Sequence, residues 1–237
     1  MLTQSQKPRE TQFILLPEAK EHPVLLISKE RLHYPNQYNS LAYVLGHHND
    51  QDFIGNINWE QAKQANASLG FHTPSPIYLV EYLRTLLSGN IYDGTGKKLC
   101  KQEIGILVDD ILTKRGPCRE EHLDARFTNQ NNNLMITYTK CNPSGIFTEV
   151  TEELDPDTLM KDKLPGISLD DWLINATSQG LPRINTKEDS LWYHHPSNDR
   201  VARFSASSTG ISFDCYRYHQ LSYSELGVRS IYSPKTS

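Results

Sequence analysis

Side chains suited to molecular recognition gather near the C-terminus, between Leu191 and Ile231. This segment contains no Lys, and Glu225 is its only Glu. Tyr offers a large contact area at low entropy cost, while Ser, Asn and Asp offer adaptable hydrogen bonds. The composition is typical of a binding surface, although a polar sheet face that binds nothing would look the same. The residues that we expect to share one exposed ligand-binding face are Tyr193, His195, Asp199, Arg200, Ser205, Ser207, Ser212, Asp214, Tyr216, Tyr218, His219 and Tyr223.

Catalytic chemistry has weaker support in the sequence. Cys215 could act as a nucleophile, but no partner base is identifiable, and its place in an alternating strand favours a small buried side chain. The segments "GHHND" (46–50) and "YHHP" (193–196) carry adjacent histidines, which point to opposite faces of a strand and have no third ligand spaced with them. The turn "DGTGKK" lacks the spacing of a phosphate-binding loop. We therefore expect no catalytic residue, no metal and no cofactor.

Composition narrows the class of partner. The chain has 237 residues, a net charge of −4 and a mean hydropathy of −0.57. Such a chain has no basic field to attract nucleic acid. Its first residues show no basic region followed by a long apolar run, so we expect neither a secretory signal nor a membrane span. The four cysteines form no C-x-x-C pair, which makes free thiols the expectation.

The first half of the chain predicts helices. Residues 1–57 form an expected N-terminal extension, with short strands at "FILL" and "PVLLIS". Asn58 can cap a helix that ends at Gly70, because apolar residues recur between them at helical spacing. Thr73 and Pro74 predict the start of a second helix, which ends near Gly89. A third helix is expected from about 102 to 114.

The second half predicts mostly strands. "LMITYTK" and "GIFTEVTEEL" are a candidate pair of strands, and "SLDDWLINA" is a short helix. After Asp189 follow four short strands, "LWYHH", "RVARFSA", "ISFDCY" and "LGVRSIY". Alternation along them should turn Phe204, Ile211, Phe213 and Cys215 largely toward the core. Helices first and strands last indicate an α+β fold.

Two segments resemble a known family. "NWEQAKQANASLGFHTPSPIYLVEYLRTL" is similar to the helix pair of C-type lectin-like domains in their formylglycine-generating-enzyme-like branch, and "LGVRSI" is similar to that branch's closing strand. The resemblance implies a C-type lectin-like fold of two helices plus short antiparallel strands over residues 58–232, with an inserted helical segment at 90–165. The usual aromatic residue of the closing strand is replaced by Val228.

Within that branch, the C-terminal part resembles the variable region of diversity-generating retroelement target proteins of archaea and their viruses. In that family, adenine-directed mutagenesis yields residues such as Tyr, Asn, Ser, Asp, His and Arg, and never Lys or Glu. The resemblance implies a variable region at 190–232 and a non-catalytic protein that displays a diversified binding surface. It also implies an unidentified protein or cell-surface ligand, a cytoplasmic or virion location, and an oligomeric state that stays open.

The resemblance does not imply sugar binding or catalysis. The E-P-N or Q-P-D loop and the W-N-D strand that hold calcium in calcium-dependent lectins are missing. Catalytic members of the formylglycine-generating branch depend on active-site cysteines near the C-terminal strands, where this chain has Cys215 alone. An enzyme-like domain of the same fold, using Cys215 or the histidines, remains the alternative.

Overall fold

The computed structural model describes residues 10–32 and 54–234, so the "GHHND" segment lies outside the described residues. Its fold class is α+β. None of the helices in the described ranges is long and apolar enough to cross a membrane. The helices are η1 (Glu10–Gln12), α2 (Trp59–Ser68), α3 (Pro76–Leu87), α4 (Lys101–Leu112) and α5 (Leu169–Asn175).

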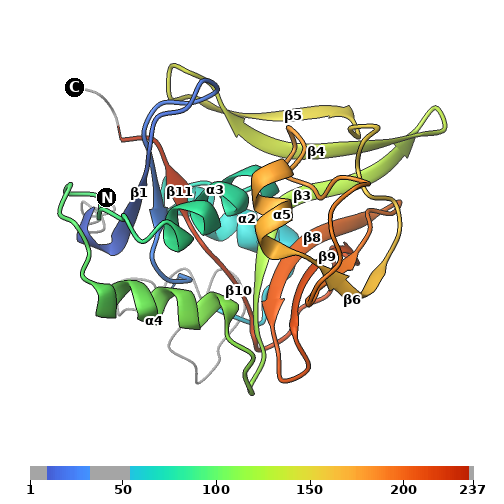
Figure 1. The fold of residues 1–237 in the computed structure, drawn as a ribbon. Coiled ribbons are helices and arrows are strands. Elements are labelled where there is room, and N and C mark those ends of the chain that lie inside the picture. Colours follow the sequence, from blue (N-terminus) through green and yellow to red (C-terminus); the bar gives the residue numbers. More distant parts are fainter. Residues whose placement is uncertain (1–9, 33–53, 235–237) are drawn as a thin grey trace.

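The strands form two sheets (Figure 1). One sheet has three strands in the order β1-β2-β11. The other has the order β5-β4-β3-β8-β9-β7-β6, and β10 pairs with β3 outside this path. Most neighbours are antiparallel, but β7–β9 and β3–β10 are parallel pairs. The strands are β1 (Phe13–Leu16), β2 (Leu25–Ser28), β3 (Arg119–Gln130), β4 (Asn133–Cys141), β5 (Phe147–Glu153), β6 (Lys163–Ile167), β7 (Leu191–His194), β8 (Arg200–Ala206), β9 (Ile211–Arg217), β10 (Leu226–Val228) and β11 (Ile231–Tyr232).

The two ends of the described chain meet in the smaller sheet (Figure 1). Ile231 of β11 lies opposite Ile27 of β2. Between β10 and β11, the buried Arg229 donates hydrogen bonds to the carbonyl groups of Ser28 and Lys29 and stacks over the ring of Tyr82, 4.6 Å away. These contacts anchor the C-terminal segment to both the first strands and helix α3.

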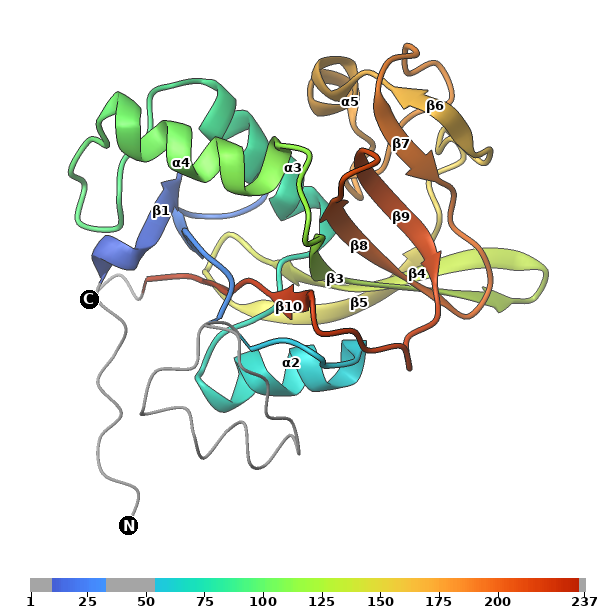
Figure 2. The ribbon, with the colours of Figure 1, turned by 90° about the horizontal axis from the view of Figure 1, so that it is seen from below.

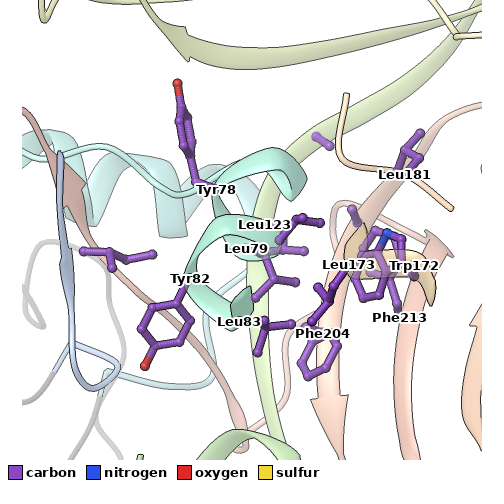
Figure 3. Packing of buried hydrophobic residues seen from close by; sticks show 14 of the residues in the cluster. Tyr78, Leu79, Tyr82, Leu83, Leu123, Trp172, Leu173, Leu181, Phe204 and Phe213 are labelled. Atoms are coloured by element: carbon purple, nitrogen blue, oxygen red, sulfur yellow. The ribbon is translucent and has the colours of Figure 1, made fainter. Parts of the chain in front are cut away.

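The main core lies between the large sheet and helices α3 and α5. Trp172 of α5 stacks on Phe213 of β9 with ring centroids 4.8 Å apart, and Phe204 of β8 packs nearby (Figure 3). Alternation along β8 and β9 therefore sends Phe204, Phe213 and Cys215 inward, as the sequence predicts. Full burial of such large apolar side chains contributes roughly 1.5–3 kcal/mol each.

Helix α2 packs in a second apolar cluster. Its Ala62 and Ala65 lie beside Val228 of β10, and Figure 2 shows α2 on one side of β10 with α3 and α4 on the other. Asn58 caps α2, as the sequence predicts. It also forms a capping box with Gln61. This capping satisfies two backbone N–H groups that the helix itself leaves without partners.

Helix α3 starts two residues later than expected. Its N-cap is Ser75 and its first residue is Pro76, not Thr73 and Pro74. Thr73 is instead buried, where its hydroxyl group accepts a hydrogen bond from the side chain of Asn66. The carbonyl of Pro74 accepts the N–H of Asp124 in β3, which keeps this stretch extended.

Two of the expected segment descriptions need correction. The segment 90–165 is expected to be helical, but α4 is its only helix. The rest of its regular structure is strands: β3, β4, β5 and the start of β6. Strand β3 lies inside the large sheet, so this segment belongs to the scaffold. The described part of the 1–57 extension likewise contributes Ile14, Leu16 and Ile27 to the main core.

Candidate functional site

The outer face of β7, β8 and β9, opposite the main core, carries a buried polar network. The term outer face is used below for this side of the three strands. Its residues are Trp192 and His194 of β7, Arg203 and Ser205 of β8, and Ser212, Asp214 and Tyr216 of β9. Cross-strand pairing sets these side chains next to each other, because opposed residues of neighbouring strands share a face.

Asp214 is the centre of this network. Its Oδ2 accepts from Nε of Arg203 at 3.0 Å and lies 2.9 Å from Nη2 of the same guanidinium. Arg203 also pairs with Glu120 of β3. The hydroxyl of Ser212 donates to Asp214 Oδ2 at 3.3 Å and lies 2.7 Å from the hydroxyl of Ser205. Charges this deeply buried require such partners, so the network belongs to the folded scaffold.

One oxygen of Asp214 has no hydrogen-bond donor. Oδ1 is buried and accepts no hydrogen bond, and Nε2 of His194 lies 3.4 Å from it. Nε of Arg217 lies 3.7 Å from Oδ2 and is also without a hydrogen-bond partner. The network therefore has unfilled hydrogen-bonding capacity where β7 and β9 approach the surface.

Exposed tyrosines and arginines lie at the end of β9 that leads into the last loop. Tyr216, Tyr218 and Tyr223 are 36%, 53% and 39% exposed. The guanidinium carbon of Arg200 lies 3.6 Å from the ring centre of Tyr218, and that of Arg217 lies 4.9 Å from the ring centre of Tyr216. Such stacks hold flat, amphipathic groups in place before any partner binds, which lowers the entropy cost of binding.

Two charged turns border these tyrosines. Asp199 has a φ of 55° and accepts a hydrogen bond from Arg126 Nη2 at 3.0 Å, which lowers the pKa of its carboxyl group. His219 Nε2 lies 3.8 Å from the same carboxylate. On the other side, His195 contacts Asp162 at 2.7 Å. Burial raises the pKa of Asp162, but hydrogen bonds from the backbone and ring of His195 outweigh this effect and lower it.

Eight of the twelve predicted site residues are at least partly exposed. Ser207 is one of them, but it lies in the β8–β9 turn, at the opposite end of these strands from Arg200 and Tyr216, where its hydroxyl bonds to Thr209 and Gly210. We call the other seven residues the recognition surface. They are His195, Asp199, Arg200, Tyr216, Tyr218, His219 and Tyr223.

The other four predicted residues are buried, and the expectation of their exposure is wrong. Tyr193 points into the core, where its ring packs 6.0 Å from that of Phe213 and its hydroxyl donates to the carbonyl of Leu159. Ser205, Ser212 and Asp214 lie on the outer face as alternation requires, but all three are buried there. These four residues support the recognition surface from beneath.

Sequence reasoning missed Arg126 and gave no role to Arg203. Arg203 is buried and Arg126 is half-buried, and both pair with acidic neighbours; Arg126 also lies 3.8 Å from Glu60 of α2. Alternation could have placed Arg203 on the same face as Asp214. The partner of Arg126 could not be found, because Asp199 is far away in the sequence.

Cys118 and Cys215 show little nucleophilic character. Cys215 is fully buried, and burial raises the pKa of its thiol well above the ordinary value. Burial and the neighbouring Glu120 raise the pKa of Cys118 to about 12. All four cysteines are free thiols. Among residues 10–32 and 54–234, no group of three His, Cys, Asp or Glu side chains is arranged to hold a metal ion.

No protein-family model, curated protein or solved structure matches this chain.

Proposed function

We propose that the protein is a non-catalytic binding protein and that the recognition surface is its binding site. The observation that carries this proposal is the pair of Arg–Tyr stacks at the exposed end of β8 and β9. Tyr and Arg are the residue types most enriched where binding energy concentrates in protein interfaces. Their ligand would be a protein or another cell-surface molecule.

The proposal extends to the origin of the surface. We infer that the chain is a diversity-generating retroelement target protein on a C-type lectin-like scaffold. The exposed tyrosines of the 190–232 region, with His195, Asp199, Arg200 and His219, belong to the residue alphabet that such mutagenesis yields, whereas the partly exposed Glu225 does not. Beneath them lie residues with structural contacts, such as Phe213 on Trp172 and Arg203 on Asp214. A surface that tolerates variation needs this separation, because the fold must not depend on the varying side chains.

An enzyme-like domain of the same fold is the alternative. Its strongest candidate group is His194, which lies 3.4 Å from Asp214 and 3.7 Å from Asp162. The burial of Cys215 counts against thiol chemistry, because a thiolate is the reactive form and burial disfavours it. The pairing of Arg203 with Asp214 is also sufficient to explain the buried carboxylate without catalysis.

Sequencing of the locus in independent isolates tests the proposal. We expect a nearby reverse-transcriptase gene, a template copy of the 190–232 region, and substitutions concentrated at Tyr216, Tyr218 and Tyr223 codons. Codons for Phe204 and Phe213 serve as internal controls and should stay constant. If the locus has no template copy, or if substitutions are spread evenly over residues 58–232, the retroelement assignment is wrong.

A second experiment tests whether the recognition surface binds ligands, independently of how the surface arose. A display library that randomises only Arg200, Tyr216, Arg217, Tyr218 and Tyr223 should yield specific binders to unrelated folded proteins. A matched library that randomises five exposed positions of α2 and α4 should yield none or far fewer. Equal yields from the two libraries would contradict a specialised role for the recognition surface.

A further inference from the structure

A concave site lies between α2 and the strands β3 and β4. The cavity has a volume of about 280 Å³ and is lined from α2 by Lys63 and Ala67, from the following loop by His72 and Thr73, and from the sheet by Asp124 and Thr139. A small molecule of a few heavy atoms up to a monosaccharide fits such a volume.

The floor of this cavity is a buried carboxylate paired with an ammonium group. Asp124 is 1% exposed, and its Oδ2 accepts the backbone N–H of Thr139 at 3.0 Å. Its Oδ1 lies 2.9 Å from Nζ of Lys63. The ammonium group has three N–H donors, and its contacts with Asp124 and Glu149 leave one of them to donate to a ligand.

The charges around the floor disfavour an ionic ligand. The ammonium group of Lys63 contacts Asp124, lies 2.7 Å from Glu149 and sits 4.6 Å from the ring centre of Trp59. A second cation at Asp124 would face this ammonium at close range. An anion would face the carboxylates of Asp124 and Glu149, with Glu60 also lining the cavity. Like charges at these distances repel in a partly desolvated site.

The walls offer neutral hydrogen-bonding groups and a flat ring. Thr139 and Thr73 line the cavity, and the hydroxyl of Thr73 accepts from Asn66, so it retains its own proton to donate. The ring of His72 stacks on Phe147 with centroids 4.3 Å apart. Burial lowers the pKa of His72, so at neutral pH its ring provides one donor and one acceptor.

From this geometry we propose that the cavity binds a small neutral molecule with adjacent hydroxyl groups, which accept from Lys63 and hydrogen-bond to Thr139 and His72 on the walls. A hydroxyl group both donates and accepts, so neighbouring hydroxyls match an ammonium donor set beside a threonine hydroxyl and an imidazole ring. A neutral ligand also leaves the Lys63–Asp124–Glu149 contacts in place. The proposal does not depend on the function proposed for the recognition surface.

The test uses the full chain labelled with ¹⁵N and follows the amide signals of Ala67, Phe71 and Thr139. The probes are glycerol, myo-inositol and methyl α-D-glucopyranoside, with methylammonium chloride and sodium acetate as cationic and anionic probes at equal ionic strength. We expect saturable shifts of these amides with at least one polyol, at millimolar affinity, and none with the ionic probes.

Three variants connect any shift to the cavity. Ala67→Trp places an indole at the exposed rim of the cavity and should weaken polyol binding about ten-fold or more, a loss of about 1.4 kcal/mol. Ser68→Trp adds the same side chain at the next exposed position of α2, outside the lining, and should bind like the wild type. Thr139→Val keeps the shape, removes one hydroxyl group and should weaken binding.

Two results would overturn the proposal. One is the absence of a saturable shift with all three polyols. The other is a polyol shift that Ala67→Trp leaves unchanged, because binding would then lie elsewhere. Stronger shifts of the same amides with methylammonium or acetate would replace the proposed ligand class with an ionic one and would also refute it.

Discussion

The tyrosines of the recognition surface should contribute little to folding. We expect the combined replacement of Tyr216, Tyr218 and Tyr223 by Ser to lower the free energy of unfolding by only about 1–2 kcal/mol. Two of these rings lose a stack with Arg200 or Arg217, and an exposed cation–π contact is worth roughly 0.5–1 kcal/mol. Tyr216 also loses its contact with His194, whose ring centre is 4.5 Å away.

A single core substitution provides the comparison. Phe204 is fully buried in the main core, so Phe204→Ala should cost about 3–5 kcal/mol through lost transfer energy and the cavity that it leaves. Both variants and the wild type are measured by urea denaturation, followed by far-ultraviolet circular dichroism and tryptophan fluorescence. Similar slopes for the three proteins would show that the unfolded states are comparable.

The result that refutes the reasoning is specific. If the triple variant loses as much stability as Phe204→Ala, the tyrosines are structural, and a surface that is free to vary cannot include them. An alternative triple variant with Phe at the same positions separates the roles of ring and hydroxyl. We expect this variant to be as stable as the wild type to within about 1 kcal/mol, because the Arg stacks persist.

Two further predictions concern the scaffold. Burial lowers the pKa of His122 from 6.5 to about 4, so the folded state favours the neutral ring. The stability from this effect is present above pH 6.5 and is lost as the pH falls toward 4, by up to about 3.5 kcal/mol at about 1.4 kcal/mol per pKa unit. Denaturation of wild type and His122→Asn at several pH values should show a stability difference that shrinks across this window, and parallel curves would contradict the prediction. A Cβ atom at Gly166 would lie 1.6 Å from the carbonyl oxygen of Leu191, so Gly166→Ala should cost several kcal/mol or abolish folding. At Gly105 of α4, an added Cβ atom would meet nothing within 4 Å. Gly105→Ala should therefore raise the melting temperature through about 0.5–1 kcal/mol of added stability. Equal effects of Gly166→Ala and Gly105→Ala would refute the argument.

Local patterns predicted much of the secondary structure. The spacing of apolar residues and the caps located α2 and α4 to within two residues. The apolar strands β8 and β9 were found from alternation, which also placed Phe204 and Phe213 in the core. These features depend on neighbours within one turn or one strand, which is why a single sequence contains them.

Strand β3 shows where such reasoning fails. Its first half, "REEHLDA", looks like a solvated segment, yet Arg119, Glu121 and His122 are buried. Their burial depends on distant partners: Asp110 lies 2.8 Å from Arg119, and Arg229 lies 3.4 Å from Glu121. A chain-local pattern cannot reveal such partners, although the alternating Leu123, Ala125 and Phe127 were a usable signal for a strand.

The sequence predicted which residues share the face of the candidate site, but not which of them are exposed. The outer face of β8 and β9 was assigned correctly, because alternation fixes which side chains share a face. Exposure depends on what covers that face, and Ser205, Ser212 and Asp214 are buried there. Tyr193 was assigned the wrong phase, since β7 turns His194 outward instead.

The pairing of β11 with β2 has a consequence for biosynthesis. Ile231 must lie beside Ile27, and Arg229 must reach the carbonyl of Ser28, before the smaller sheet is complete. A nascent chain lacks β11 until the 201 residues that separate Ser28 from Arg229 have been synthesised, so the β1–β2 pair waits for its third strand over that interval. Contacts this distant in sequence slow folding and lengthen the time in which a chain can aggregate. Synthesis of β11, rather than emergence of the first strands, is therefore the step that allows the smaller sheet to be completed.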